Sequence, residues 1–189
     1  MKKKKNGFTL LELIITLSIT VVVLGIIFTF FLNANKTITT SEVNSDLQIE
    51  IENIQKELSK YGSEASGIES FVSKDDTALD PSSTTQNYSS YDIDYLGKID
   101  TKEIAFKVES NIYKFTYDSS TRVLKLANKN LELSNKVIEF KVRPLDYRSN
   151  PDGNFNTANG IEISFVLNGK KGYSDVTIPA SLIVKFRNK

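Results

Sequence analysis

One carboxylate lies in an apolar stretch that carries no other charge. Glu12 is the only charged residue between Phe8 and Leu32, a run of 25 mostly apolar residues. A charged side chain at the centre of a membrane-spanning helix costs roughly 2.5–3.5 kcal/mol on insertion scales, so a carboxylate in this run needs a functional explanation. One simple explanation is that Glu12, only seven residues after Lys5, reaches back to the membrane interface.

The run is long enough to cross a bilayer as a helix, which needs about 20 residues. By the positive-inside tendency, the N-terminus stays in the cytoplasm, because four lysines precede the run: Lys2, Lys3, Lys4 and Lys5. A secretory signal peptide has a shorter apolar core, and a lipoprotein signal needs a cysteine that the chain lacks. A plain single-span anchor explains the lysines and the length, but neither Glu12 nor the glycine at position 7.

The order of residues around this glycine resembles a known processing signal. Lys2 to Lys5, Asn6 and Gly7, followed by Phe8-Thr9-Leu10-Leu11-Glu12, are similar to the class III signal peptide of type IV pilins and type II secretion pseudopilins. The resemblance implies that a prepilin peptidase cuts after Gly7 and that the new N-terminus, Phe8, is N-methylated. It further implies that Glu12 pairs with the N-terminal amine of a neighbouring subunit during assembly. Two unit charges 4 Å apart attract by roughly 4 kcal/mol at an effective dielectric of 20.

The composition argues against an enzyme and against a bound cofactor or metal. The chain has no cysteine and no histidine, which removes the commonest general base and the commonest metal ligands. We therefore expect no catalytic residues, no cofactor and no metal site. Removal of residues 1–7 leaves 20 basic and 23 acidic residues, a net charge of −3 (20 − 23). Residues 8–100 carry −9 (5 − 14) and residues 101–189 carry +6 (15 − 9), which predicts an acidic stem and a basic head.

A helical pattern continues past the apolar run. The apolar spacing of four, four, three, four and three residues predicts one stripe on a helix, formed by Val43, Leu47, Ile51, Ile54, Leu58 and Tyr61. A helix from Phe8 to about Tyr61 would be roughly 80 Å long, with Gly62 as its C-cap. The predicted divisions are a leader at 1–7, a membrane or filament-core half at 8–32, an amphipathic half at 33–61, a helix-to-sheet loop at 62–101 and a sheet at 102–189.

The last two divisions predict an α+β fold. Residues 62–101 are rich in Ser, Asp, Thr and Gly and predict a mostly irregular connection with room for a short helix or strand. In it, Tyr88, Tyr91 and Tyr95 form either a contact surface or anchors for the loop. From Glu103 onward the apolar period becomes two, which predicts about four to six antiparallel strands in meander order, with a turn at 168–172. The residues expected to face the helix are Ile104, Phe106, Val108, Ile138, Phe140, Val142, Ile161, Ile163, Phe165 and Leu167.

Two further features admit alternative interpretations. Residues 146–154, with Asp146 and Asp152, are interpreted as a turn at Pro-Asp-Gly or, less well, as an ion site, because the EF-hand pattern is absent. Three interpretations apply to the basic residues of the second half: they bind DNA phosphates, they keep the sheet soluble, or they face the acidic stem of another subunit. These residues are Lys125, Lys129, Lys136, Lys141, Arg143, Arg148, Lys170, Lys171, Lys185 and Arg187.

The resemblance implies a twisted antiparallel sheet packed on the long helix, and it implies the function of a filament subunit. A long strand within 136–147 that follows a hairpin resembles minor pilins and pseudopilins of the W or J type, so the sequence favours a minor subunit. Its implied partners are other pilin subunits, prepilin peptidase, the assembly platform and the membrane, and its implied location is the cytoplasmic membrane and then the cell surface. The alternatives are a major pilin or competence pseudopilin with a DNA-binding or adhesive role, and a single-span membrane protein with an extracytoplasmic β domain.

Overall fold

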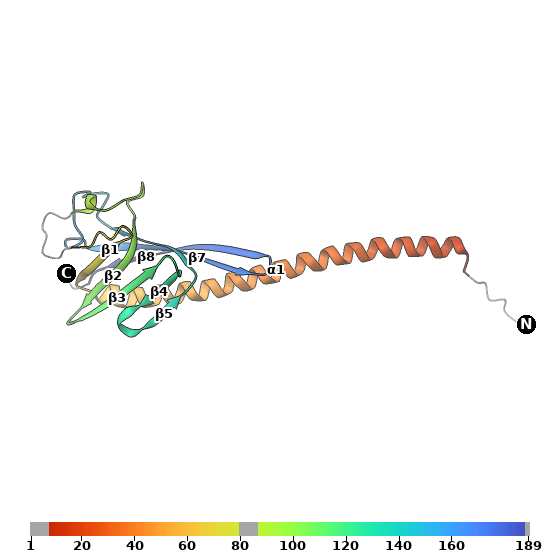
Figure 1. The fold of residues 1–189 in the computed structure, drawn as a ribbon, viewed down its shortest axis with the longest axis horizontal. Coiled ribbons are helices and arrows are strands. Elements are labelled where there is room, and N and C mark those ends of the chain that lie inside the picture. The colour runs from red at the N-terminus through yellow and green to blue at the C-terminus, as the bar shows by residue number, and fades with distance from the viewer. Residues whose placement is uncertain (1–7, 80–86, 188–189) are drawn as a thin grey trace, which may run out of the picture.

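One helix extends over nearly a third of the chain. The computed structural model describes residues 8–79 and 87–187, and in it α1 (Leu10–Glu64) contains 55 residues, about 80 Å at 1.5 Å per residue. Its N-terminal half projects away from the rest of the molecule, and its C-terminal half carries a curled sheet (Figure 1). The α+β class and the long N-terminal helix that the sequence predicts are confirmed.

The predicted C-cap at Gly62 is wrong, because α1 continues to Glu64 and is capped by Ala65, whose N–H donates to the Gly62 carbonyl at 3.2 Å. Gly62 is instead a buried residue of the last turn. A Cβ atom at this position would lie 2.5 Å from Cγ1 of Val184, well inside van der Waals contact. The glycine is therefore required because the sheet approaches the helix backbone closely there.

Over the described residues the sheet contains eight antiparallel strands, more than the four to six that the alternating pattern predicts. The additional strands are short or lie in the segment predicted to be mostly irregular, where β1 pairs with β2. Short 3₁₀ turns, η1 (Tyr88–Ser90) and η2 (Ala127–Lys129), lie in the connections. The strands are β1 (Gly67–Ser73), β2 (Ile99–Val108), β3 (Asn111–Asp118), β4 (Val123–Leu126), β5 (Leu131–Ser134), β6 (Val137–Pro144), β7 (Gly160–Lys171) and β8 (Ser174–Lys185).

The strand order departs from the predicted meander at β2. The order is β5-β4-β3-β2-β6-β7-β8, so β6 lies next to β2 rather than next to β5. Residues 99–100 of β2 pair with β6, whereas residues 103–108 pair with β3. Because β2 has ten residues, it can serve two partners in succession, and the sheet opens between β3 and β6.

The core lies between the sheet and one face of α1. The six residues of the predicted helical stripe are all buried, and most of the predicted inner-face residues of the sheet are buried as well. Val108 is only partly buried. The prediction that Ile138 faces the helix is wrong, since Val137 is buried in its place. A register shift between Val137 and Glu139 changes which side chain of β6 faces inward.

The longest hairpin, β7–β8, lies along α1 and is the part of the sheet that reaches farthest toward the N-terminal half (Figure 1). The predicted turn at 168–172 is shifted, since residues 168–171 belong to β7 and the chain reverses at Gly172 and Tyr173. Gly172 has φ = +56°, a conformation that glycine adopts without strain. Near this tip the hydroxyl groups of Thr40 and Ser174 share a hydrogen bond of 2.8 Å, which ties the hairpin to the helix.

Candidate functional site: the N-terminal half of the helix

The N-terminal half of α1 is a bare apolar rod. All residues from 8 to 32 are exposed, and the large apolar side chains among them retain between 47% and 79% of their accessible surface. An 18-residue window of α1 has a mean hydropathy of 2.7, so the helix is long and apolar enough to cross a membrane. A helix that is apolar all round needs lipid or other helices around it.

The polar side chains of this half are satisfied by the helix itself. The hydroxyl of Thr16 donates to the Leu13 carbonyl at 3.0 Å, and that of Ser18 donates to the Ile14 carbonyl at 2.9 Å. Thr20 and Thr29 make the same kind of bond to carbonyls three or four residues earlier. Because no water is available in hydrocarbon, such internal bonds are what a membrane or a filament core requires of polar groups.

Glu12 lies in the first turn of α1 and caps it. The Glu12 N–H donates to Oγ1 of Thr9 at 3.3 Å, and Oε2 of Glu12 accepts from the Thr9 N–H at 3.5 Å, which is a capping box. The pattern Thr9-x-x-Glu12 is the sequence signal for this box. The carboxylate therefore has a local partner in the isolated subunit, besides any partner in another chain.

Of the other predicted processing residues, the structure describes Phe8. Phe8 directly precedes Thr9 and is exposed over 77% of its surface. Gly7 and the lysines at positions 2 to 5 lie outside the described residues. After a cut between Gly7 and Phe8, Thr9 would keep its backbone N–H, so the capping box of α1 would survive processing.

Most of the predicted basic residues of the head are engaged within the chain. Two contact the acidic stem, since Lys171 pairs with Glu42 and Lys136 pairs with Glu50. Lys129 donates to the Tyr61 hydroxyl at 2.7 Å. The remaining intramolecular pairs lie within the sheet and its loops: Lys141 with Asp94 and Asp100, Arg143 with Glu162, and Lys170 with Asp175. The contact between basic head and acidic stem thus occurs inside one subunit.

The loop tyrosines divide into anchors and one exposed side chain. Tyr88 and Tyr91 are buried, whereas Tyr95 is 94% exposed. The Tyr88 hydroxyl lies 2.8 Å from Oδ1 of Asp146 and 2.9 Å from the Asn154 carbonyl, and burial together with Asp146 raises the pKa of this phenol. Burial alone raises the pKa of Tyr91 to about 12.

The Pro-Asp-Gly segment forms a turn, as the sequence predicts. The Gly153 N–H donates to the Asn150 carbonyl at 3.0 Å, and the Gly153 carbonyl accepts from the Tyr88 N–H at 2.8 Å. Asp146 is held by Tyr88. Over the part of the chain that the structure describes, no group of three metal-ligating side chains comes together.

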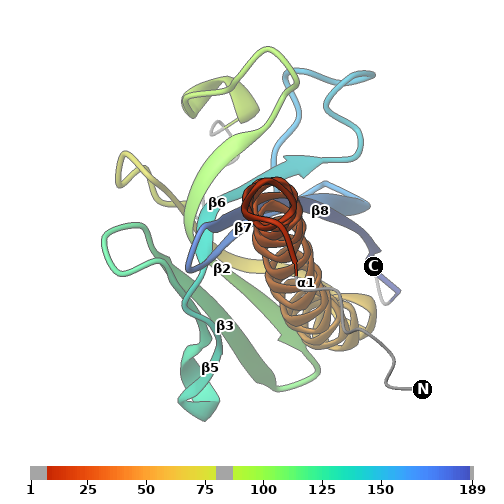
Figure 2. The ribbon, with the colours of Figure 1, turned by 90° about the vertical axis from the view of Figure 1, so that its right-hand side faces the viewer.

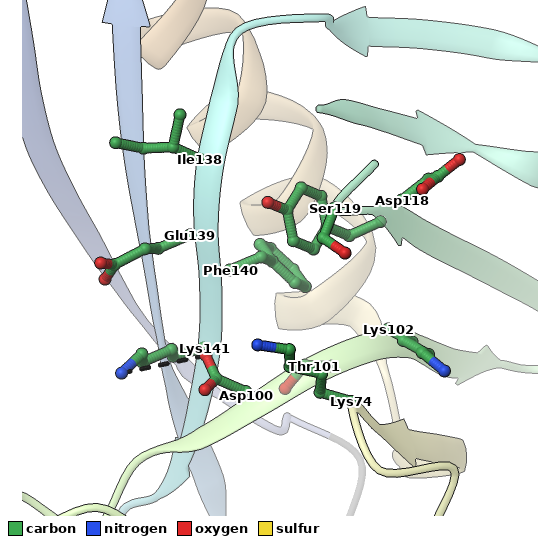
Figure 3. A pocket seen from close by; sticks show the side chains of 11 residues that line it. Lys74, Asp100, Thr101, Lys102, Asp118, Ser119, Ile138, Glu139, Phe140 and Lys141 are labelled. Atoms are coloured by element: carbon green, nitrogen blue, oxygen red, sulfur yellow. Dashed lines mark ion pairs between the residues drawn. The ribbon is translucent and has the colours of Figure 1, made fainter. Parts of the chain in front are cut away.

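A hollow of about 480 Å³ occupies the opening between β3 and β6 (Figure 3). Its walls carry both signs of charge, and several of these charges are paired: Lys102 with Asp76 at 2.6 Å, and Lys141 with Asp100 at 3.8 Å. Hydrogen bonds from Ser120 hold the pKa of Asp118 at about 2. This arrangement is a charged surface depression that follows from the branching at β2.

The comparison with known proteins identifies the N-terminal segment. A long N-terminal helix packed against a curled antiparallel sheet is consistent with the pilin fold. Residues 2–28 match the prokaryotic N-terminal methylation motif. This motif marks the class III signal peptide of type IV pilins and pseudopilins, so the resemblance that the sequence suggested is confirmed. No curated protein and no solved structure matches the chain.

The motif indicates a structural subunit rather than an enzyme. It implies processing by a prepilin peptidase and association with other pilin subunits. Together with the apolar half of α1, it is consistent with anchoring in a membrane followed by a place in a surface filament.

Proposed function

We propose that this chain is a minor subunit of a type IV pilus or of a related pseudopilus. The observation that carries the proposal is that the methylation motif leads directly into a fully exposed apolar helix half that is continuous with a folded head. Before assembly this half holds the subunit in the cytoplasmic membrane, with the N-terminus on the cytoplasmic side and the head outside. After assembly the same half lies in the filament core and the head faces outward.

In this mechanism, a prepilin peptidase removes residues 1–7 and Phe8 becomes the methylated N-terminus. The new amine is a cation that lies four residues before Glu12, close to it along the helix axis. Glu12 of an incoming subunit pairs with the amine of a subunit already docked at the assembly platform. The pair compensates for the carboxylate in apolar surroundings, so docking is favoured over remaining in lipid.

The minor rather than major assignment rests on the resemblance of residues 136–147 to subunits of the W or J type, in which a strand follows a hairpin; here the eight residues of β6 follow the short β4–β5 hairpin. A DNA-binding role receives less support, because most of the basic side chains considered for it are paired within the chain. Quantitative mass spectrometry of purified filaments measures the abundance of the chain. A minor subunit occurs well below the level of the main component.

The proposal is tested by intact and N-terminal mass spectrometry of the chain from a host that contains its prepilin peptidase. We expect a mature chain that begins at N-methyl-Phe8. The matched variant is Gly7→Val, in which a branched side chain replaces the residue before the cut, and we expect it to keep its leader. A wild-type chain that retains Lys2 to Lys5 would refute the proposal and favour a plain single-span membrane protein.

A further inference from the structure

The tip of the β7–β8 hairpin carries an aromatic side chain that the rest of the chain leaves almost bare. Gly172 and Tyr173 form the two-residue connection between Lys171 and Ser174, and Tyr173 is 95% exposed. A single exposed aromatic residue is ordinary on a protein surface. The place of this one is not, because the hairpin lies on one side of α1 (Figure 2) and its tip points along the helix toward the apolar run 8–32 (Figure 1).

The hairpin follows the helix axis, so a position on β8 corresponds to a position on α1. The backbone of Gly62 approaches the side chain of Val184, and the hydroxyl of Thr40 bonds to that of Ser174. Between these contacts the strand advances ten residues (184 − 174), about 33 Å, and the helix advances 22 residues (62 − 40), also about 33 Å. Because the two lengths agree, the hairpin runs parallel to α1, and Tyr173 lies about 3 Å beyond Ser174 toward the apolar run.

This geometry sets the height of Tyr173 above a membrane that residues 8–32 span. Thr40 lies eight residues past Leu32, about 12 Å along the axis, so the backbone of Tyr173 lies about 9 Å past the end of the apolar run. The headgroup layer extends about 5–7 Å beyond the hydrocarbon core, and a tyrosine side chain is long enough to cover the remaining distance. Lys36, the first charged residue after the run, lies about 6 Å past Leu32, in the same layer.

The chemistry of the tip suits a headgroup layer. Tyrosine is enriched at membrane–water interfaces, because its ring is apolar and its hydroxyl is polar. The two lysines at the end of β7 are engaged within the chain, Lys170 with Asp175 and Lys171 with Glu42. The amphipathic ring of Tyr173, and not a net positive charge, is therefore the feature of the tip that lipid can bind.

We propose that Tyr173 inserts into the lipid headgroups on the outer face of the membrane before assembly, so that the β7–β8 tip is a membrane-contact surface of the head. The hydrogen bond between Thr40 and Ser174 ties the tip to α1, and interfacial tyrosine and lysine side chains restrict the tilt and rotation of a membrane helix. The subunit is then held at a defined height and orientation until it leaves the membrane. The inference rests on the proposed function, which places residues 8–32 in the membrane and the head outside it.

The absence of tryptophan permits a test with a single fluorescent reporter in the full chain. The Tyr173→Trp chain is reconstituted in vesicles of phosphatidylcholine, a lipid without net charge. We expect its emission at a shorter wavelength than that of Tyr95→Trp, with stronger quenching by a lipid spin-labelled in the headgroup and weaker quenching by iodide in the water. Tyr95 is the matched control, because it is 94% exposed but lies in the connection before β2 and not on the hairpin.

A third reporter, Val22→Trp, tests the membrane segment separately. Val22 lies near the middle of the apolar run and is 62% exposed, so a lipid labelled at the end of its acyl chain should quench a tryptophan there. Quenching of Val22→Trp together with equal behaviour of Tyr173→Trp and Tyr95→Trp would overturn the inference and leave the proposed function standing. A signal from Tyr173→Trp that disappears when the protein is diluted in lipid would assign the tip to a protein contact and would also overturn it. A Val22→Trp chain that no labelled lipid quenches would refute the membrane segment of the proposed function itself.

Discussion

The capping role that the structure gives to Glu12 and the pairing role that we propose for it predict opposite results for one substitution. As a helix cap, Glu12 accepts the Thr9 N–H through Oε2, and glutamine serves equally well in a capping box. As the partner of a neighbouring N-terminal amine, the carboxylate must be charged, and glutamine cannot replace it. Glu12→Gln thus keeps the cap and removes the charge, whereas Glu12→Ala removes both.

The two roles also differ in size. Loss of a helix cap costs about 0.5–2 kcal/mol, which corresponds to about a 2- to 30-fold effect. Loss of a pair of unit charges 4 Å apart costs roughly 4 kcal/mol at an effective dielectric of 20, or close to a thousandfold. We therefore expect Glu12→Gln to be excluded from filaments nearly as strongly as Glu12→Ala.

The assay is competition inside one cell. A wild-type chain and a variant with distinguishable peptide masses are expressed at equal levels, and their ratio is measured by mass spectrometry in purified filaments and in the membrane fraction. The membrane ratio controls for synthesis and insertion, and the mass of the N-terminus controls for leader removal. Incorporation of Glu12→Gln at the wild-type level, with Glu12→Ala reduced, would show that Glu12 acts as a cap and would refute charge pairing in assembly.

Three further predictions concern the head. Gly62→Val places a Cβ atom 2.5 Å from Cγ1 of Val184, so we expect a loss of about 1–3 kcal/mol in the free energy of unfolding. Adding Val184→Ala should restore part of this loss. Equal stability of Gly62→Val and wild type in denaturant unfolding would contradict the prediction. Tyr88→Phe removes the hydrogen bond to Asp146 and should cost about 1–3 kcal/mol, whereas Tyr91→Phe removes a buried hydroxyl that has no hydrogen-bond partner among the described residues and should be neutral or stabilising. The folded-state pKa of Tyr91 is about 12 against an ordinary 10.0, so ionisation of this phenol favours the unfolded chain as the pH rises from 10 toward 12. Tyr91→Phe should therefore reduce the alkaline loss of stability measured by unfolding at pH 7 and pH 11.

The helix was predictable because its signals are local. The apolar spacing between Val43 and Tyr61 matches the period of an α-helix and not that of a strand, and all six residues of that stripe are buried in the structure. The capping box was also readable from Thr9 and Glu12. The role of Gly62 was not, because the reason for the glycine is the approach of Val184, more than 100 residues later in the chain.

Most of the strands were predictable one by one, but β1, β5 and the order of the sheet were not. Alternation identifies β2, β3, β6, β7 and β8, yet it does not say which strand lies beside which. The branching of β2 between β6 and β3 depends on pairings across the whole head. In the same way, the register shift after Val137 exchanges one core residue for its neighbour, and no local pattern marks it.

The sequence allowed a contact between the basic head of one subunit and the acidic stem of another, whereas in the structure head and stem pair within one chain. Lys171 and Glu42 are each about half exposed, and pairs of this kind contribute about 0–1 kcal/mol. The buried stripe from Val43 to Tyr61 therefore supplies most of the energy that holds the head on the helix. The ion pairs instead restrict the rotation of the head about α1, because Lys136 and Lys171 contact the stem from two different strands or strand ends.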